Sequence, residues 1–252
     1  LENYQPLMDV IEFVSDYPGL DDPDIAAYKA EFEQRIDIEY AIKYLLTCLV
    51  VGAVDSFGKD LMLNTWGNEG GLYPKWYLTF YDLDTCVGIN NFGRMLKSDG
   101  ETPEYDYDIE LVDEGAFAQA QSRLWDVINE LFAEEVAEYY AALRTGAFSY
   151  DTLWHYLYDE QIAKISKGMY NANAIRKYIK APGAEQYLHM LHGDRITQMS
   201  RWLSNRLLFL DSKYAYNTDA KKLSFRITTN DASQVSFTLT TDIHQWVEIL
   251  VG

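Results

Sequence analysis

The sequence has few cysteines, few basic residues and no long apolar run, and each shortage excludes a class of protein. Only two cysteines, Cys48 and Cys86, occur in 252 residues, so at most one disulfide can form, and we expect two buried thiols instead. The longest apolar run, "LLTCLVVGAV" at 45–54, is far shorter than the roughly 20 residues that span a bilayer. We therefore expect a core helix there and no membrane span.

Positive charge is also scarce. The 21 Lys and Arg residues face 39 Asp and Glu residues, which gives a formal net charge of −18. Because such a surface repels a phosphate backbone, nucleic acid is not an expected partner. A bound divalent ion can nevertheless bring a nucleotide to an acidic chain. No H-E-x-x-H or G-x-S-x-G motif occurs, so zinc peptidase and serine hydrolase chemistry have no support.

The hydrophobic content of 48% is sufficient for a full core, and its periodicity predicts a mainly helical α+β fold. A central helix is predicted from about residue 37 to residue 52, after a helix over "IAAYKAEFEQR" (25–35). Two short strands, 60–66 and 75–81, are predicted to form a hairpin. Further helices are predicted over 117–136, after an N-cap at Ser149, around 171–180 and over 185–211.

The apolar period changes from helical to alternating after residue 214. Three strands are predicted, around 223–227, 235–239 and 246–251, as the start of a β-sandwich-like module. We therefore expect two domains, 1–214 and 222–252. Because the sequence opens on Leu1 and the sheet stops at Gly252, we also expect a longer chain to contain these residues.

Two aspartates follow the aromatic run "KWYLTFY" (75–81). Residues two apart in a strand point to the same side, so Asp82 and Asp84 would lie together if the strand continued through them. Two neighbouring anions repel each other unless a cation or hydrogen-bond donors compensate them. The pair indicates either a site for a hard metal ion or the solvated end of a strand.

A second acidic element follows the central helix in "VDSFGKDLML" (54–63). Asp55 and Asp60 are five residues apart with Lys59 between them, and this interval equals that of the D-x-x-x-x-N catalytic loop of protein kinases. There the first residue orients the attacking hydroxyl and the second helps to hold magnesium. The alternative for Asp55 is an ordinary turn or N-cap role, because Asp before Ser and Gly favours turns.

The ordered unit "VDSFGKDLMLNTW…KWYLTFYDLDTCVGINNFG" resembles the core of the CotH (spore-coat protein H) kinase-like family, atypical relatives of protein kinases. Members have an aspartate about five residues before an asparagine, a short hairpin, and then a D-x-D-x-x-x-G motif. In this chain the motif is Asp82, Asp84 and Gly88. The resemblance covers roughly residues 36–214 and implies a helical core like a kinase C-lobe with a small β-hairpin.

The resemblance also implies roles for individual residues. Asp55 would be the catalytic-loop aspartate, with Lys59 as the basic residue beside it. Asp60, Asp82 and Asp84 would bind Mg²⁺ or Mn²⁺, and Asp60 and Asp82 would contact ATP through it. The implied reaction is metal-dependent transfer of phosphate to hydroxyl groups of a protein substrate.

Two departures from the family pattern favour an alternative. Asp60 stands in place of the expected asparagine, and only about 35 residues precede the central helix, without the glycine-rich strands that clamp a nucleotide in kinases. Similar sequences occur among bacteriophage structural proteins. The chain would then be a pseudokinase, a non-catalytic scaffold that binds partner subunits in a larger assembly such as a virion. The sequence leaves the location open: an extracellular site on a spore surface is compatible with the first function, and a virion with the second.

Overall fold

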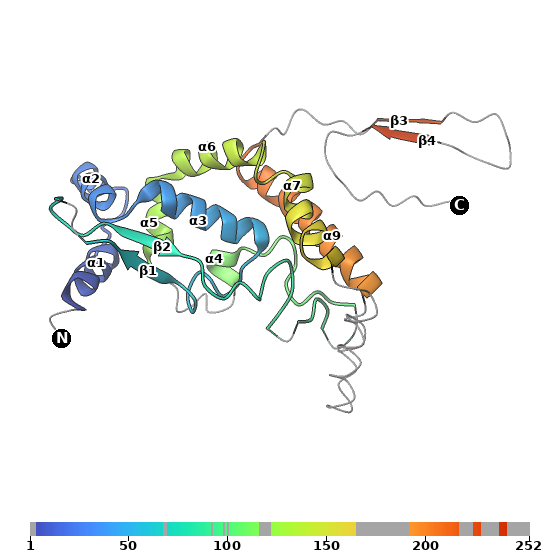
Figure 1. Cartoon of the computed structure of the whole chain (residues 1–252). Coiled ribbons are helices and arrows are strands. Elements are labelled where there is room, and N and C mark those ends of the chain that lie inside the picture. The colour runs from blue at the N-terminus through green and yellow to red at the C-terminus, as the bar shows by residue number, and fades with distance from the viewer. Residues whose placement is uncertain are drawn as a thin grey trace, which may run out of the picture.

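The computed structural model describes residues 4–67, 70–91, 93–97, 99, 101–115, 122–164, 192–216, 224–227 and 237–240. Figure 1 shows a mainly helical α+β fold, as the periodicity predicts. The elements are α1 (Gln5–Ser15), α2 (Ile25–Arg35), α3 (Ile38–Val51), β1 (Met62–Thr65), β2 (Trp76–Thr79), α4 (Leu111–Glu114), α5 (Leu124–Leu131), α6 (Ala133–Arg144), α7 (Tyr150–Trp154), the π-helical turn η3 (His155–Asp159), the 3-10 turn η4 (Ile162–Lys164), α9 (His192–Lys213), β3 (Ser224–Ile227) and β4 (Phe237–Thr240).

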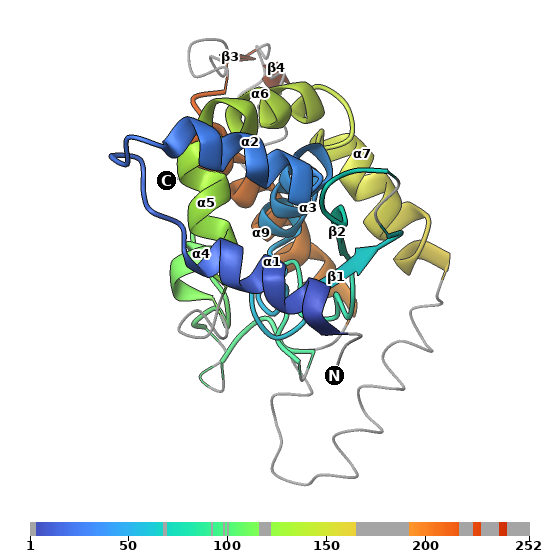
Figure 2. The same ribbon diagram turned by 90° about the vertical axis from the view of Figure 1, so that its left-hand side faces the viewer.

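Helix α3 is the centre of the core, and the prediction of a central helix is confirmed. Asp37 caps its first turn by accepting a hydrogen bond from the Tyr40 N–H (3.0 Å), and the helix ends at Gly52 with φ +67°. Helix α6, strand β2 and helix α9 pack against it, and in Figure 2 it lies in the middle of the surrounding helices. Its buried side chains are Ala41, Ile42, Tyr44, Leu45, Leu46, Cys48, Leu49 and Val50.

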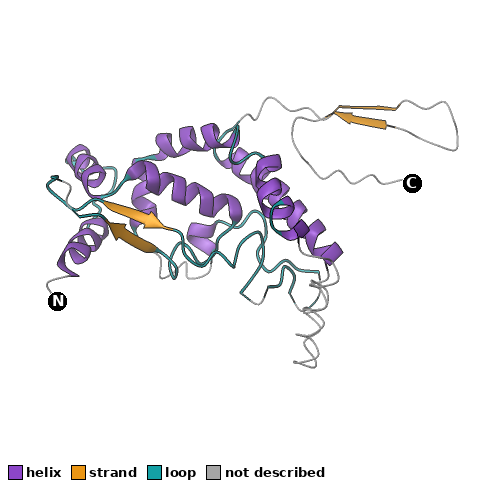
Figure 3. Ribbon diagram, viewed as in Figure 1, coloured by secondary structure: helices purple, strands orange, loops and turns teal. Residues whose placement is uncertain are grey.

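The β1–β2 hairpin lies beside α3 (Figure 3). Its strands are antiparallel, with Met62 opposite Thr79 and Thr65 opposite Trp76. The Asp37 N–H donates to the Trp76 carbonyl (2.9 Å), which joins the hairpin to the first turn of α3. The hairpin is confirmed, but β2 ends at Thr79. Asp82 and Asp84 therefore lie in the following loop, and the expectation that they share one side of a strand is wrong.

The region predicted as one helix over 117–136 contains a break. Helices α5 and α6 are separated by Phe132, which adopts φ −123°, outside the helical range, and whose side chain is buried. Residues 116–121 lie outside the described residues. Ser149 caps α7 as predicted, since its Oγ accepts a hydrogen bond from the Thr152 N–H (3.2 Å).

The C-terminal part that the structure describes consists of helix α9 and the strands β3 and β4. Helix α9 packs against α3 and α7, which confirms a helix over most of 185–211. Strands β3 and β4 form an antiparallel hairpin, with Ser224 opposite Thr240. The helix predicted around 171–180 and the strand predicted over 246–251 lie outside the described residues. Among the helices that the structure does describe, none is long and apolar enough to cross a bilayer.

Candidate kinase-like site

The turn after α3 is fixed to the core by its backbone. The Asp60 N–H donates to the Asp55 carbonyl (3.1 Å), which closes the turn over the five-residue interval. The Trp125 indole donates to the Phe57 carbonyl (2.8 Å), and the Tyr44 hydroxyl donates to the Ser56 carbonyl (3.1 Å). Because two buried aromatic side chains hold its carbonyls, this turn has little freedom to move.

Lys59 bridges the two aspartates of this turn. Its Nζ lies 3.2 Å from Asp55 Oδ2 and 3.4 Å from Asp60 Oδ2. The Asp55 and Asp60 side chains are only 9% and 7% exposed, whereas that of Lys59 is 47% exposed. The hydrogen bond that Lys59 donates to Asp55 and the negative charges of both carboxylates raise the pKa of Lys59. The structure thus brings these three predicted site residues together as one ion-paired group.

The loop that contains Asp82 and Asp84 adjoins this turn. The Val54 N–H donates to the Thr85 carbonyl (3.3 Å), and the Val87 N–H donates to the Val51 carbonyl (2.6 Å). Asp82 has φ +48°, a left-handed conformation that aspartate tolerates better than most residues. These two hydrogen bonds attach the D-x-D-x-x-x-G loop to the end of α3.

The two acidic elements differ in burial. Asp82 and Asp84 are exposed, whereas Asp55 and Asp60 are buried. Within the described part of the chain, no three His, Cys, Asp or Glu side chains come close enough together to hold a metal ion by themselves. Magnesium in phosphoryl-transfer sites is usually held by one or two carboxylates, with phosphates and waters as further ligands. The donor set therefore fits a metal that arrives with a nucleotide, and it does not fit a metal held by protein alone.

Residues of α9 that the sequence did not reveal complete the surroundings of the site. Arg206 is fully buried and donates to the carbonyls of Leu49 (2.7 Å), Tyr107 (2.9 Å) and Ile109 (2.7 Å). Burial lowers the pKa of its guanidinium to about 10. Trp202, one turn earlier, is 7% exposed and packs beside both acidic loops. Gly52 and Gly88 make room for this contact, but they gave no signal for Trp202 in the sequence, because glycine is expected at any left-handed position.

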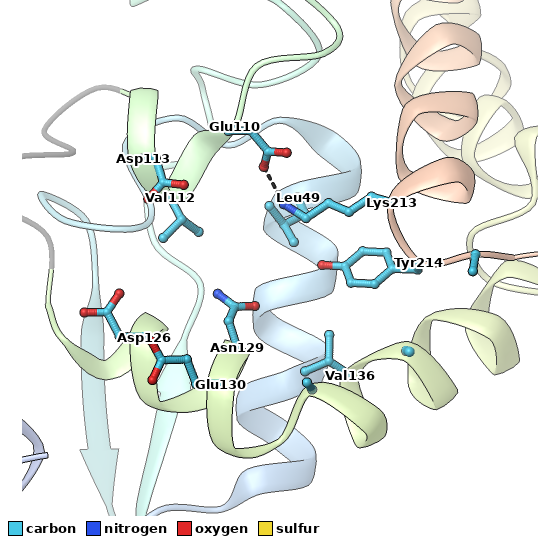
Figure 4. Close-up of a pocket in the computed structure, with 13 residues that line it drawn as sticks. Leu49, Glu110, Val112, Asp113, Asp126, Asn129, Glu130, Val136, Lys213 and Tyr214 are labelled. Carbon is cyan, nitrogen blue, oxygen red and sulfur yellow. Dashed lines mark hydrogen bonds and ion pairs between the residues drawn. The ribbon is translucent and has the colours of Figure 1, made fainter. Parts of the chain in front are cut away.

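A separate cavity of about 570 Å³ lies between α3, α5, α6 and the end of α9 (Figure 4). Glu110 forms an ion pair with Lys213 at its rim, and the remaining charged side chains that line it are acidic: Asp113, Asp126 and Glu130. An anionic nucleotide would be repelled there. No residue of the acidic loops lines this cavity, so it is not part of the candidate site.

The order of central helix, acidic turn, hairpin and second acidic loop defines a kinase-like domain. The family model described as CotH kinase protein matches residues 2–210. The chain therefore belongs to the CotH kinase family. The match includes α1 and α2, which precede the motifs that carry the sequence resemblance. Comparison with curated proteins and with solved structures gave no match.

Proposed function

We propose that this domain binds ATP together with Mg²⁺ or Mn²⁺ and transfers phosphate to hydroxyl groups of a protein substrate. The observation that supports it best is the pair of hydrogen bonds between the two acidic loops, Val54 N–H to Thr85 O and Val87 N–H to Val51 O. They bring the D-x-D-x-x-x-G loop to the turn of Asp55. Phosphoryl transfer depends mainly on such positioning and on charge stabilisation.

Asp55 is the proposed catalytic aspartate. Its carboxylate is buried and fixed within a closed turn, so it can accept the proton of an incoming hydroxyl in one orientation. Lys59 bridges it to Asp60 and offsets the negative charge of both. This compensation explains how an aspartate can stand where the family has asparagine.

One or two of the carboxylates of Asp60, Asp82 and Asp84 are the proposed metal ligands, since the described residues bring no three such groups close enough to share an ion. Their carboxylate oxygens are the ligand type that magnesium and manganese prefer, and phosphate oxygens of the nucleotide would complete the set. A metal bound there would neutralise the charge that develops on the transferred phosphate. Because Asp82 and Asp84 are exposed, a nucleotide can approach them from solvent.

Calorimetric titration of the purified protein with ATP, with magnesium and with EDTA, tests this proposal. We expect binding only with magnesium, with a Kd between roughly 1 μM and 1 mM. Asp82→Ala should weaken binding at least about tenfold, because it removes a proposed ligand. Asp21→Ala, an exposed aspartate before α2, is the matched control and should bind as wild type does.

A second experiment separates binding from catalysis. Asp55→Asn should still bind magnesium and ATP but lose roughly 10²- to 10⁴-fold of phosphate transfer to a hydroxyl-bearing protein substrate. An Asp55→Asn variant with wild-type transfer would contradict the catalytic role. Magnesium-independent binding in the first experiment would contradict the metal role.

A non-catalytic scaffold in a larger assembly such as a virion is the second candidate. It is favoured by the Lys59 bridge, which already satisfies Asp55 and Asp60 within the chain. Absence of magnesium-dependent binding in both wild type and Asp82→Ala would support it, and its partners would then be subunits of the assembly. A spore-surface location is compatible with a family that is named after a spore-coat protein.

A further inference from the structure

The indole of Trp202 lies in contact with both acidic loops. A Cβ added to Gly52 would lie 2.3 Å from its Cη2 atom, and one added to Gly88 would lie 2.7 Å from its Cδ1 atom. Such distances are far below van der Waals contact, so only glycine fits at either position. Gly52 lies three residues before Asp55, and Gly88 ends the D-x-D-x-x-x-G motif. A single side chain therefore fills the space between the two loops.

Trp202 also contacts a third segment. Its Nε1 donates to the Tyr105 carbonyl (3.0 Å), so the plane of the ring is fixed as well as its position. The Tyr105 hydroxyl is affected by the charge of Asp55: burial raises the pKa of this hydroxyl, and the negative charge of the Asp55 carboxylate raises it further. The ring thus links three segments that surround the buried aspartate.

Helix α9 holds the indole rigidly. Arg206 follows Trp202 by one helical turn and fixes α9 to the Leu49 carbonyl in the last turn of α3. Around the indole, Val87, Met95 and Met199 form a small buried cluster that is distinct from the main core. Val87 joins the loop of Asp82 and Asp84 to α9 through this cluster, and in the part of the chain that the structure describes two backbone hydrogen bonds attach the same loop to the end of α3.

We propose that Trp202 is a positioning residue that sets the separation between the Asp55 turn and the Asp82–Gly88 loop, and with it the affinity for metal and nucleotide. The contact between Trp202 and the two loops follows from the structure alone, whereas its effect on affinity rests on the proposed function. Trp202 acts through the two loops and does not touch the nucleotide.

Cys86 provides a natural reporter of the loop. It lies between Asp84 and Gly88, is half-buried, and packs against the Trp202 cluster. Cys48 is fully buried in α3 and serves as the internal reference. The rate of alkylation of Cys86 by iodoacetamide at a single pH, read for each cysteine by mass spectrometry, therefore measures how tightly the loop is held.

We would measure this rate and the affinity for ATP with magnesium in Trp202→Leu and Trp202→Phe. Trp202→Leu should raise the Cys86 rate and weaken ATP binding by about tenfold each, because the loop opens more often. Trp202→Phe keeps a ring but loses the hydrogen bond to Tyr105, so both effects should be smaller. Tyr140→Phe, which removes a part-buried hydrogen bond to Asp211 near the C-terminal end of α9, is the control for general loss of stability.

The outcomes separate the two proposals. Faster Cys86 alkylation without any ATP binding in wild type would leave the loop contact supported and would overturn the proposed function. An unchanged Cys86 rate in Trp202→Leu would overturn the positioning role. An equal change in Tyr140→Phe, or faster alkylation of Cys48, would also overturn it, because the effect would then be a general loosening of the fold.

Discussion

At the scale of single residues, Gly88 is required for two reasons, its backbone conformation and the lack of space for a side chain. Its backbone is left-handed, with φ +78°, and its Cα faces the indole of Trp202. Only the first reason applies to Gly70, because its φ is +84° but nothing lies within 4 Å of the place where a Cβ would be. The two glycines therefore separate backbone strain from steric overlap.

Gly88→Ala should destabilise the protein more than Gly70→Ala. Both substitutions lower the free energy of unfolding by about 1–2 kcal/mol, because alanine is strained in the left-handed region. Gly88→Ala adds roughly 1–3 kcal/mol for displacing the indole, as overpacking does in a core. Urea unfolding followed by circular dichroism gives both free energies. Equal losses in the two variants would contradict the contact between Gly88 and Trp202.

Lys59 is the second residue with a testable role. Lys59→Met should lower the melting temperature, because two buried carboxylates would lose the cation between them. Millimolar Mg²⁺ should restore part of the loss, since a cation can then reach the freed carboxylates. Lys43→Met removes an exposed pair with Glu39 and is the control. Equal melting temperatures for Lys59→Met and Lys43→Met would argue against the bridge.

At the scale of elements, the sequence predicted the helix ends that are determined by residues within one turn of them. The Asp37 cap and Gly52 define α3, and Ser149 defines the start of α7, because caps act within one turn. The break at Phe132 was missed because the apolar spacing continues through it. The buried Arg206 was missed as well, because its acceptors are carbonyls at residues 49, 107 and 109, which no local pattern brings together.

Arg206 supplies the element-scale prediction. Arg206→Met keeps the bulk of the side chain but leaves the carbonyls of Leu49, Tyr107 and Ile109 without this donor. The bond to the Leu49 carbonyl is buried and those to Tyr107 and Ile109 are part-buried. An unsatisfied buried acceptor costs about 1–3 kcal/mol, so we expect a loss of roughly that size in the free energy of unfolding. Ser212→Ala, at an exposed position near the end of α9, should change it by less than about 0.5 kcal/mol. Comparable losses in the two variants would contradict the anchoring role of Arg206.

At the scale of the whole molecule, the candidate site combines short-range and long-range contributions. The sequence was sufficient to predict that Asp55, Lys59 and Asp60 belong together, because one turn contains all three. It could not give the exposure of Asp82 and Asp84, because that depends on where β2 ends. It also could not reveal Trp202, which is about 150 residues from Gly52 and reaches the site only through the packing of α9 on α3.

The same packing predicts how the whole fold responds to alkaline pH. Burial raises the pKa of Tyr17 to about 12 and also raises the pKa values of Tyr44 and Tyr140. The unfolded chain loses these protons near pH 10, whereas the folded chain keeps them. Stability is therefore fully present below pH 10 and is lost as the pH rises through about 12.

We expect tyrosinate absorbance to rise in two phases. Tyrosines with exposed side chains, among them Tyr4, Tyr81 and Tyr156, account for the first phase, which lies near pH 10 in the folded protein. The second phase, at higher pH, should coincide with the loss of helical circular dichroism, because the buried hydroxyls ionise only as the core opens.

Tyr140→Phe removes one of the linked groups, so the alkaline midpoint, measured relative to the stability at neutral pH, should move upward. Complete tyrosine ionisation near pH 10 with unchanged circular dichroism would show that the tyrosines are not buried in one cooperative core. Tyr44 lies in α3, Tyr140 lies in α6, and Tyr17 packs in the same core after α1. If the ionisation of the buried tyrosines and the loss of circular dichroism coincide, these elements unfold as one unit.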